Sequence, residues 1–379
     1  MRYERDTAKI KKKLLLIFHK PLNQVDGQTK YLKELVDVIS NEYIVLIPSE
    51  DCYKYYVLKN RNWILRTIMI NIYLTLWVIK NRKSIKNDYF LCLMEDRYSL
   101  LPSLVVSKLT GIKLLSRISD WGKEYVDSFN LKGRISTHSI CLLDLFYKKF
   151  VLNYSDGVIV PSEFLYSLIR QEFNKSILTF PLPYSLTENN VKFIETAINV
   201  KDEQHDIYCA LIGNFNYIPN EESANFICKE LAPQVFKTDN KIRFLIIGPG
   251  SKEKYSKYSS NNVVLMGMVD DLSCIYKQCQ IGINLSKTSG GTSIKNIEYL
   301  VNGMIVISTP EAAIGVIRSN NLLIEDRLNF ANTIIELSKK IRNNEIYADK
   351  KEVDRIRNYY SKDEISKNTL SFLEEFNYR

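Results

Sequence analysis

The chain has 379 residues, of which 45% are hydrophobic and 25% are charged, with 52 Lys and Arg against 43 Asp and Glu and a net charge of +9. This is an ordinary balance for a soluble globular protein, and the length exceeds what one core accommodates, so two domains are predicted. The basic residues are dispersed and no nucleic-acid module is recognisable, which argues against nucleic acid as a partner. The basic excess suits phosphate-bearing ligands or an anionic membrane surface.

Apolar runs alternate with amphipathic patterns through the first half, which predicts a parallel α/β sheet. The predicted strands are 14–18, 43–47, 89–94, 112–118 and 157–160, and the predicted helices are 28–39, 100–109, 139–153 and one capped by Ser162. Gly27 ends the loop after the first strand, and Asp120 follows the fourth strand. Open α/β sheets bind ligands at such strand ends, although Asp120 could equally cap its own loop.

The apolar segment 63–79 is shorter than the roughly 20 residues of a membrane span, and Arg66 and Asn71 interrupt it. A helix packed on the sheet is the favoured interpretation. Basic residues flank the segment on both sides, so an amphipathic helix that touches an anionic membrane remains an alternative.

Seven cysteines form no C-x-x-C pair, and several lie in apolar patterns where cysteine behaves as a small hydrophobe. No secretory signal precedes the first strand, so reduced thiols in a cytoplasmic protein are expected.

The periodicity breaks at residues 180–183, and about twenty polar residues follow. We therefore predict an N-terminal domain over 1–185, a linker over 186–206, a second domain over 207–360 and a final helix over 361–379. Within the second domain the predicted strands are 208–212, 243–247, 263–266, 281–285 and 304–308, and the predicted helices are 221–236, 272–278 and 329–342. Gly248-Pro249-Gly250 lacks the third glycine of a dinucleotide fingerprint and is interpreted as a turn before a lysine-rich loop.

The most informative motif is the run from Thr288 to Glu298, a Gly-Gly loop between an apolar strand and a helix opened by Thr292 or Ser293. Backbone N–H groups and the positive end of the helix dipole converge at such a start and bind anions. Lys295 and Glu298 are three residues apart and share one helix face, as a phosphate and a sugar hydroxyl would require. A solvated surface pair is the alternative.

Five ordered pieces of the second half resemble the C-terminal domain of retaining, family-4-type GT-B glycosyltransferases (glycosyl transferases group 1). They end at Asn220, Gly250, Leu272, Glu298 and Pro310 and lie within residues ~207–326. The first half is similar only in layout, through its glycine loop.

The resemblance implies a GT-B fold, which is an α/β arrangement of two Rossmann-like domains facing a cleft, with the final helix returning to the first domain. It implies a nucleoside-diphosphate-sugar donor, a glycan or lipid-linked acceptor and no separate cofactor. The carboxylate of Glu298 would hold the donor ribose. Donor binding would also involve Gly27 in the first domain and these residues of the second: Gly213, Asn214, Gly267, Met268, Val269, Gly290, Gly291, Thr292, Ser293 and Lys295.

This chain departs from the family pattern at its cations. Many relatives carry an acidic residue where this chain has Gly290, and many carry an Arg and a Lys where it has Asn214 and Asn220. A branch with a Gly-Gly-Thr-Arg-x-Lys loop has its lysine at the position of Lys295 and its arginine at that of Ser293. The site is therefore expected to carry one cation fewer than most relatives.

The expected reaction is glycosyl transfer to an acceptor hydroxyl, with Lys295 and the helix start stabilising the leaving diphosphate and Asp120 on the acceptor side. No D-x-D pair lies at a strand end, so no essential metal is predicted, and Asp270-Asp271 is interpreted as a helix cap. Two alternatives remain, a nucleotide-sugar epimerase of the same architecture and a catalytically weak donor-binding or assembly subunit.

Overall fold

The structure is a computed structural model that describes residues 12–18, 27–48, 63–95, 99–119, 135–184, 206–287, 292–345 and 348–378. These residues form two compact units. The first unit contains the described residues up to Pro183 together with those from Lys362 onward, and the second contains the described residues from Tyr184 to Ser361.

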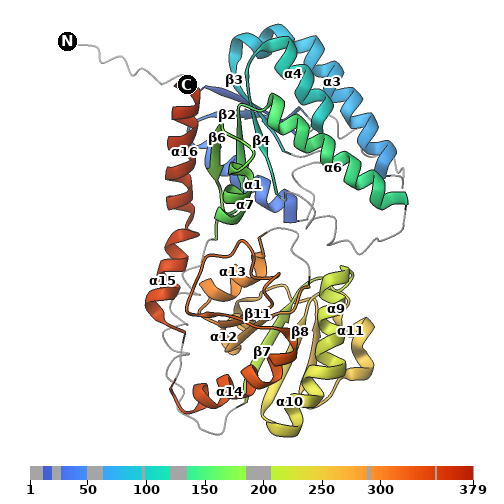
Figure 1. The fold of residues 1–379 in the computed structure, drawn as a ribbon, viewed down its shortest axis with the longest axis vertical. Coiled ribbons are helices and arrows are strands. Elements are labelled where there is room, and N and C mark those ends of the chain that lie inside the picture. Colours follow the sequence, from blue (N-terminus) through green and yellow to red (C-terminus); the bar gives the residue numbers. More distant parts are fainter. Residues whose placement is uncertain are drawn as a thin grey trace, which may run out of the picture. The chain divides into compact units, whose positions relative to one another are not determined.

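The first unit is built on a six-stranded parallel sheet with the order β2-β1-β3-β4-β5-β6 (Figure 1). Its strands are β1 (Lys13–Ile17), β2 (Ile44–Leu46), β3 (Tyr89–Met94), β4 (Lys113–Arg117), β5 (Gly157–Val160) and β6 (Ser176–Thr179). The inner strands are nearly continuous apolar runs, and every residue of β5 is buried. Such runs are typical of parallel strands that are covered on both faces.

Helices connect these strands and supply the core. They are α1 (Gly27–Ser40), α3 (Trp63–Asp88), α4 (Leu100–Thr110), α6 (Ile135–Tyr154) and α7 (Glu163–Arg170). One face of α3 packs on the core of the first unit. Its Leu74 and Val78 lie in the same buried cluster as Leu15 of β1 and Val151 of α6. The prediction that this apolar segment is a helix packed on the sheet is confirmed. The predicted cap of α7 is also confirmed, because the Ser162 hydroxyl accepts a hydrogen bond from the Leu165 N–H at 3.4 Å.

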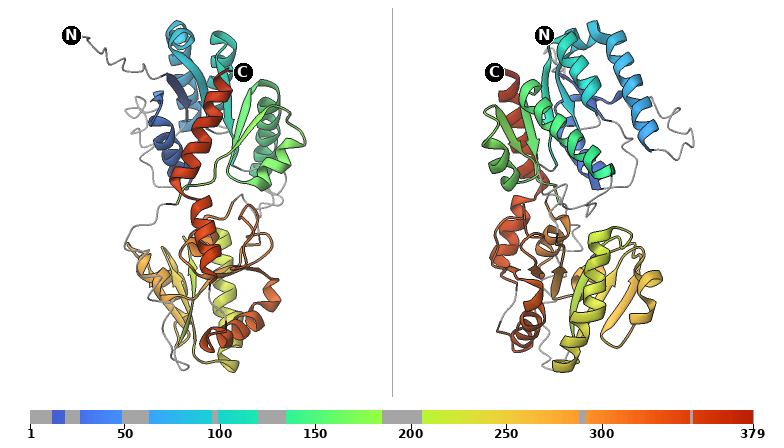
Figure 2. Two further views of the ribbon diagram at one scale, coloured as in Figure 1. Left: turned by 90° about the vertical axis from the view of Figure 1, so that its left-hand side faces the viewer. Right: turned by 45° about the vertical axis from the view of Figure 1, so that its right-hand side comes forward.

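The last helix, α16 (Lys362–Tyr378), returns to the first unit, as the resemblance implied (Figure 2). It packs beside α1 and β6. The Lys113 ammonium donates to the Phe376 carbonyl at 2.6 Å. A Cβ atom at Gly157 would lie 2.6 Å from the Phe376 ring, so β5 needs a glycine where α16 crosses it.

The second unit is a six-stranded parallel sheet with the order β12-β11-β10-β7-β8-β9. Its strands are β7 (Ile207–Ile212), β8 (Ile242–Ile247), β9 (Val263–Gly267), β10 (Ile281–Asn284), β11 (Ile305–Ser308) and β12 (Leu322–Ile324). Its helices are α9 (Ile218–Phe226), α10 (Ala232–Thr238), α11 (Ser251–Tyr255), α12 (Ser273–Gln278), α13 (Ile294–Val301), α14 (Phe330–Arg342) and α15 (Lys350–Tyr359). A π-helical turn over Ile227–Leu231 joins α9 to α10.

The sequence prediction differs from this fold in a few elements. It missed β6, β12 and α15, which are short or poorly patterned. It was wrong about the segment after Gly250, where α11 begins at once instead of a loop. Gly248 and Gly250 have φ values of 132° and 85°, which glycine adopts readily, and this explains the pair without any nucleotide. The predicted linker over 186–206 lies outside the described residues except at Asp206.

Candidate functional site

The carboxyl ends of the parallel strands lie at one edge of the second sheet, and glycines bring their backbones into contact there. The Gly248 N–H donates to the Gly267 carbonyl at 2.7 Å. A Cβ atom at Gly248 would lie 2.0 Å from the Gly213 carbonyl oxygen. Since a side chain would push these loops apart, the glycines keep the ends of β7, β8 and β9 together.

Helix α13 is the next described helix after β10 and carries Lys295 in its first turn. The Lys295 ammonium donates to the Asn220 side-chain carbonyl at 2.8 Å. The Asn220 amide in turn donates to the Asn214 carbonyl at 3.0 Å. Burial lowers the pKa of Lys295 to about 8, and the Glu298 carboxylate partly opposes this shift. The Lys295 ammonium is therefore fixed by a hydrogen bond at the edge of the sheet. Because burial affects its pKa, it is not half of a solvated surface pair with Glu298.

Glu298 lies one turn further along α13 and is partly buried. The Tyr276 hydroxyl, from α12, donates to its carboxylate at 3.3 Å. Burial, followed by the Glu298 charge, raises the pKa of Tyr276, so the phenol stays protonated and remains a donor. Tyr276 thus orients the carboxylate from a neighbouring element.

A network of amides and hydroxyls fixes the start of α13 on the sheet. The Asn284 amide donates to the Ser293 hydroxyl at 2.8 Å and to the Asn296 side-chain carbonyl at 3.0 Å. Asn296 is fully buried and donates to the Ser308 hydroxyl at 3.0 Å. Sequence reasoning missed Asn284 and Asn296, although polar residues in otherwise apolar runs were a signal of a buried polar network.

The Thr292 hydroxyl lies at the N-terminal side of this helix. Its oxygen is buried, and it has no hydrogen-bond partner within the described part of the chain. With the N–H groups of the first helical turn and the Lys295 ammonium, it belongs to a region whose polar groups suit an anion. The arrangement can bind and stabilise negative charge.

The structure brings together only part of the predicted set. Hydrogen bonds of Asn220 link Asn214 to Lys295, and the Asn220 side chain lies against Gly213. Gly267 joins them through the backbone of Gly248. Met268 is 73% exposed after β9, while Val269 packs on the cluster that contains Tyr276 and Ile297. Gly27 begins α1. Three predicted residues, Asp120, Gly290 and Gly291, lie outside the described residues.

Asp271 has the capping role expected for it. Its carboxylate accepts from the Ser273 N–H at 2.9 Å at the start of α12. The hydrogen bonds from Ser273 lower the pKa of Asp271, as a capping carboxylate requires. The prediction that the reaction needs no metal stays a prediction.

A buried ion pair that sequence reasoning missed lies at the carboxyl edge of the first sheet. The Arg117 guanidinium, at the end of β4, donates to the Glu95 carboxylate just after β3 at 2.6 Å. Both side chains are almost fully buried, and Arg117 lies 4.3 Å from the centre of the Tyr31 ring. The pair fixes the strand end from which the chain continues to Asp120.

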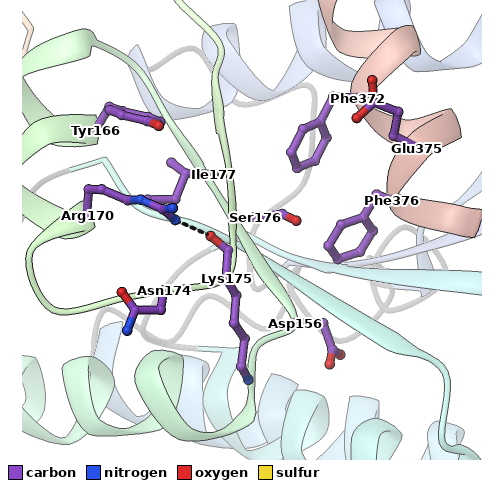
Figure 3. Close-up of a pocket in the computed structure, with 10 residues that line it drawn as sticks. All are labelled: Asp156, Tyr166, Arg170, Asn174, Lys175, Ser176, Ile177, Phe372, Glu375 and Phe376. Atoms are coloured by element: carbon purple, nitrogen blue, oxygen red, sulfur yellow. Dashed lines mark hydrogen bonds between the residues drawn. The ribbon is translucent and has the colours of Figure 1, made fainter. Parts of the chain in front are cut away.

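A pocket of about 380 Å³ lies elsewhere in the first unit, between β6, the end of α7 and α16 (Figure 3). Arg170, Lys175 and Phe376 are among its lining residues. Arg170 donates to the Lys175 carbonyl at 2.9 Å. Asp156 and Ser176 place the pocket at the amino ends of β5 and β6, opposite the edge where parallel sheets bind ligands, and none of the predicted site residues lines it.

Within the described residues, no helix combines the length and hydropathy that crossing a membrane requires. Among the described residues, the free thiols include Cys92, Cys209, Cys228, Cys274 and Cys279.

Comparison with known proteins gives a match to the second unit. Residues 206–340 match the family model described as glycosyl transferases group 1. A curated relative, an uncharacterized 44.6 kDa protein in the cps region of Klebsiella pneumoniae, is 24% identical over 269 residues. The aligned part covers 68% of this chain and 66% of that relative, just under two thirds of its length.

Solved structures resemble the whole chain. HepE from Anabaena, in complex with UDP and glucose, superposes with a TM-score of 0.61 over 96% of this chain and 99% of that one, at 10% identity. Sucrose-phosphate synthase from Thermosynechococcus elongatus superposes with a TM-score of 0.65 over 96% and 98%, at 13% identity. At such identities the likeness shows the fold. The predicted fold class, two Rossmann-like parallel sheets as in GT-B glycosyltransferases, is confirmed.

Proposed function

We propose that this protein, which has the GT-B glycosyltransferase fold and a group 1 match over residues 206–340, transfers a glycosyl group from a nucleoside-diphosphate sugar to an acceptor hydroxyl. The bond between the anomeric carbon and the diphosphate oxygen breaks, and the acceptor oxygen forms the new bond as its proton is released. The observation that carries this proposal is the start of α13, where Lys295 is held by Asn220 and Glu298 by Tyr276.

Lys295 and the start of α13 would stabilise the leaving diphosphate. Negative charge grows on this group as the sugar bond breaks, and fixed donors aimed at growing charge accelerate such a step. The ammonium is already oriented by Asn220, 2.8 Å away, so little rearrangement is needed. The dipole of α13 adds partial positive charge at the same end of the helix.

Glu298 would hold the donor through its ribose hydroxyls. A carboxylate accepts two hydrogen bonds at once, and charge-assisted bonds of this kind are strong. The Tyr276 hydroxyl occupies one side of the carboxylate at 3.3 Å and sets its direction. Backbone at 267–269 is proposed to contact the base.

A uridine-diphosphate sugar is the first donor to test. HepE, which shares the fold, has been crystallised with UDP and with UDP-glucose. The acceptor is proposed to be a glycan or a lipid-linked glycan, with Asp120 on the acceptor side, and the protein is proposed to work in the cytoplasm. Retention of configuration and independence of metal are parts of the same proposal.

Two other functions would use the same fold. A catalytically weak donor-binding or assembly subunit would keep Lys295 and Glu298 without acceptor chemistry. An epimerase would release the nucleotide with an altered sugar. The absence of the Arg and Lys found in relatives, at the positions of Asn214 and Asn220, keeps the binding subunit as the second candidate.

The proposal is tested with purified full chain and a panel of nucleoside-diphosphate sugars. A ligand that binds the native state raises its melting temperature, so a thermal-shift screen selects the donor. Release of the nucleoside diphosphate is then measured with a cell lysate or with simple sugars as the source of acceptor. Analysis of the sugar product separates transfer from epimerisation. Binding without any turnover would support the subunit interpretation, and no shift with any donor would contradict the proposed function.

A further inference from the structure

The outer face of α3 carries an unusual row of apolar side chains. Between Thr67 and Ile79, each exposed position of this helix holds a large apolar residue that is 40–60% exposed. These residues are Ile68, Met69, Ile72, Leu76 and Ile79. Their spacing places them on one side of the helix.

The opposite side of α3 is the one that the core requires. Ile70, Leu74, Val78 and Ile85 are buried against the sheet. The outer row is therefore not needed to hold the helix in place, and burying it would release apolar surface from water. Contiguous exposed apolar surface of this kind marks an interaction site.

Large apolar side chains are also exposed on the neighbouring helices. α3, α4 and α6 lie side by side in one layer on the first sheet (Figure 2). On α6, Leu142, Leu145 and Phe146 are 51–65% exposed. On α4, Leu101 and Leu109 are about half exposed.

Positive charge lies next to the apolar row. The exposed part of α3 that follows Ile79 carries Lys80, Arg82, Lys83 and Lys86 against a single acidic residue, Asp88. Lys83 and Lys86 follow the apolar row on its own side of the helix, because they lie four and seven residues after Ile79. The surface thus pairs an apolar row with a basic end.

We propose that the outer face of α3, with the basic end of the same helix, docks the first unit on an anionic membrane surface. The apolar side chains enter the boundary between lipid headgroups and acyl chains, and the lysines contact acidic headgroups. The contact is peripheral, because α3, although 26 residues long, does not combine this length with the hydropathy that a span requires. A second copy of the chain is a poorer occupant, since in a symmetric contact α3 of the other copy would offer these cations a single acidic side chain, Asp88.

This inference is independent of the transfer reaction, because lipid binding needs neither donor nor acceptor. The full chain is sedimented with vesicles of phosphatidylcholine that contain phosphatidylglycerol and with vesicles of phosphatidylcholine alone. We expect binding to the anionic vesicles and much weaker binding to the neutral ones. Added salt should weaken the binding, because it screens the lysines.

Two double variants and two controls identify the surface. Ile72→Glu with Leu76→Glu should lower anionic-vesicle binding at least about tenfold, and Lys83→Glu with Lys86→Glu should lower it about tenfold and reduce its salt dependence. Leu328→Glu, at a side chain 87% exposed in the second unit, and Lys339→Glu with Lys340→Glu on α14 should bind as the parent does. Thermal melts verify that each variant is folded.

Three results would overturn the proposal. In the first, the parent does not sediment with anionic vesicles. In the second, the control variants lose as much binding as the α3 variants. In the third, both α3 variants bind the vesicles as the parent does. Concentration-dependent dimers that the Ile72→Glu, Leu76→Glu variant abolishes, in a parent without vesicle binding, would assign the face to a second copy instead.

Discussion

The Lys295 ammonium donates a 2.8 Å hydrogen bond to the side-chain carbonyl of Asn220, which lies 75 residues earlier in the chain. Asn220 lies in the first turn of α9, at a position where the family that the sequence resembles carries a cation, and Lys295 lies in the first turn of α13. The contact therefore brings positive charge from α13 to the end of β7. It gives a physical reason why an asparagine can stand at position 220.

Lys295→Ala should lower turnover by about a hundredfold or more, because it removes a donor aimed at the leaving diphosphate. The apparent KM for the donor should change less, since the lysine stabilises the bound donor less than it stabilises the transition state. Lys295→Arg should rescue poorly because its fork differs in shape. Steady-state kinetics at saturating acceptor test this, with Lys339→Ala on α14 as the control, and parent-like turnover in Lys295→Ala would end the assignment.

The pH dependence of kcat/KM should show a loss of activity as pH rises through about 8, because Lys295 gives up its proton there. Asn220→Asp should move this loss to higher pH, since a carboxylate beside the ammonium favours its charged form. An alkaline limb that does not move in this variant would assign the titration to another group.

The same pKa has a consequence for stability with a definite sign. Burial lowers the pKa of Lys295 from 10.5 in the free side chain to about 8. Between these values the unfolded chain binds more protons than the folded one, so the contribution of this group to stability rises with pH in that window. This contribution is measured by comparing the pH dependence of the free energy of unfolding in urea for the parent and for Lys295→Met.

Glu298→Ala should weaken donor binding by about 1.5–3 kcal/mol, the usual value of hydrogen bonds to a charged group. Tyr276→Phe should weaken it less, because the carboxylate stays but loses one orienting hydrogen bond of 3.3 Å. Calorimetric titration with the selected donor gives both values, with Tyr258→Phe as the control. A folded Glu298→Ala variant that binds donor as tightly as the parent would contradict the ribose role.

Activity should survive exhaustive chelation, because the start of α13 and Lys295 are proposed to supply the positive charge at the diphosphate. Transfer is measured after dialysis against EDTA and again with added magnesium or manganese. Loss of activity that either metal restores would show that the reaction needs a metal ion.

Glu95→Gln should destabilise the protein by about 3–5 kcal/mol, because it leaves the Arg117 charge buried without its partner. Both side chains are at most 3% exposed. Glu172→Gln breaks the exposed pair with Lys148 and should change stability by less than about 1 kcal/mol. Urea unfolding of the two variants makes the comparison, and equal effects would show that the buried pair contributes no more than the exposed one.

Local patterns were enough to predict much of the fold. The alternation of apolar strands with amphipathic helices indicated two parallel sheets, and the Ser162 cap was read correctly from its residue type. These features depend on residues that are close together in the chain, and their spacing can be seen in the sequence. Short edge elements such as β6 and β12 were missed because an edge strand has a weak apolar pattern.

The candidate site divides in the same way. The sequence by itself determined that a helix with Lys295 and Glu298 on one face opens after a glycine loop. Only the tertiary structure decided their partners, Asn220 and Tyr276, because these come from other elements whose proximity depends on strand order and register. The Glu95–Arg117 pair and the exposed outer row of α3 were hidden for the same reason. Which side of a helix faces the sheet, and what covers the other side, is fixed by packing between distant segments.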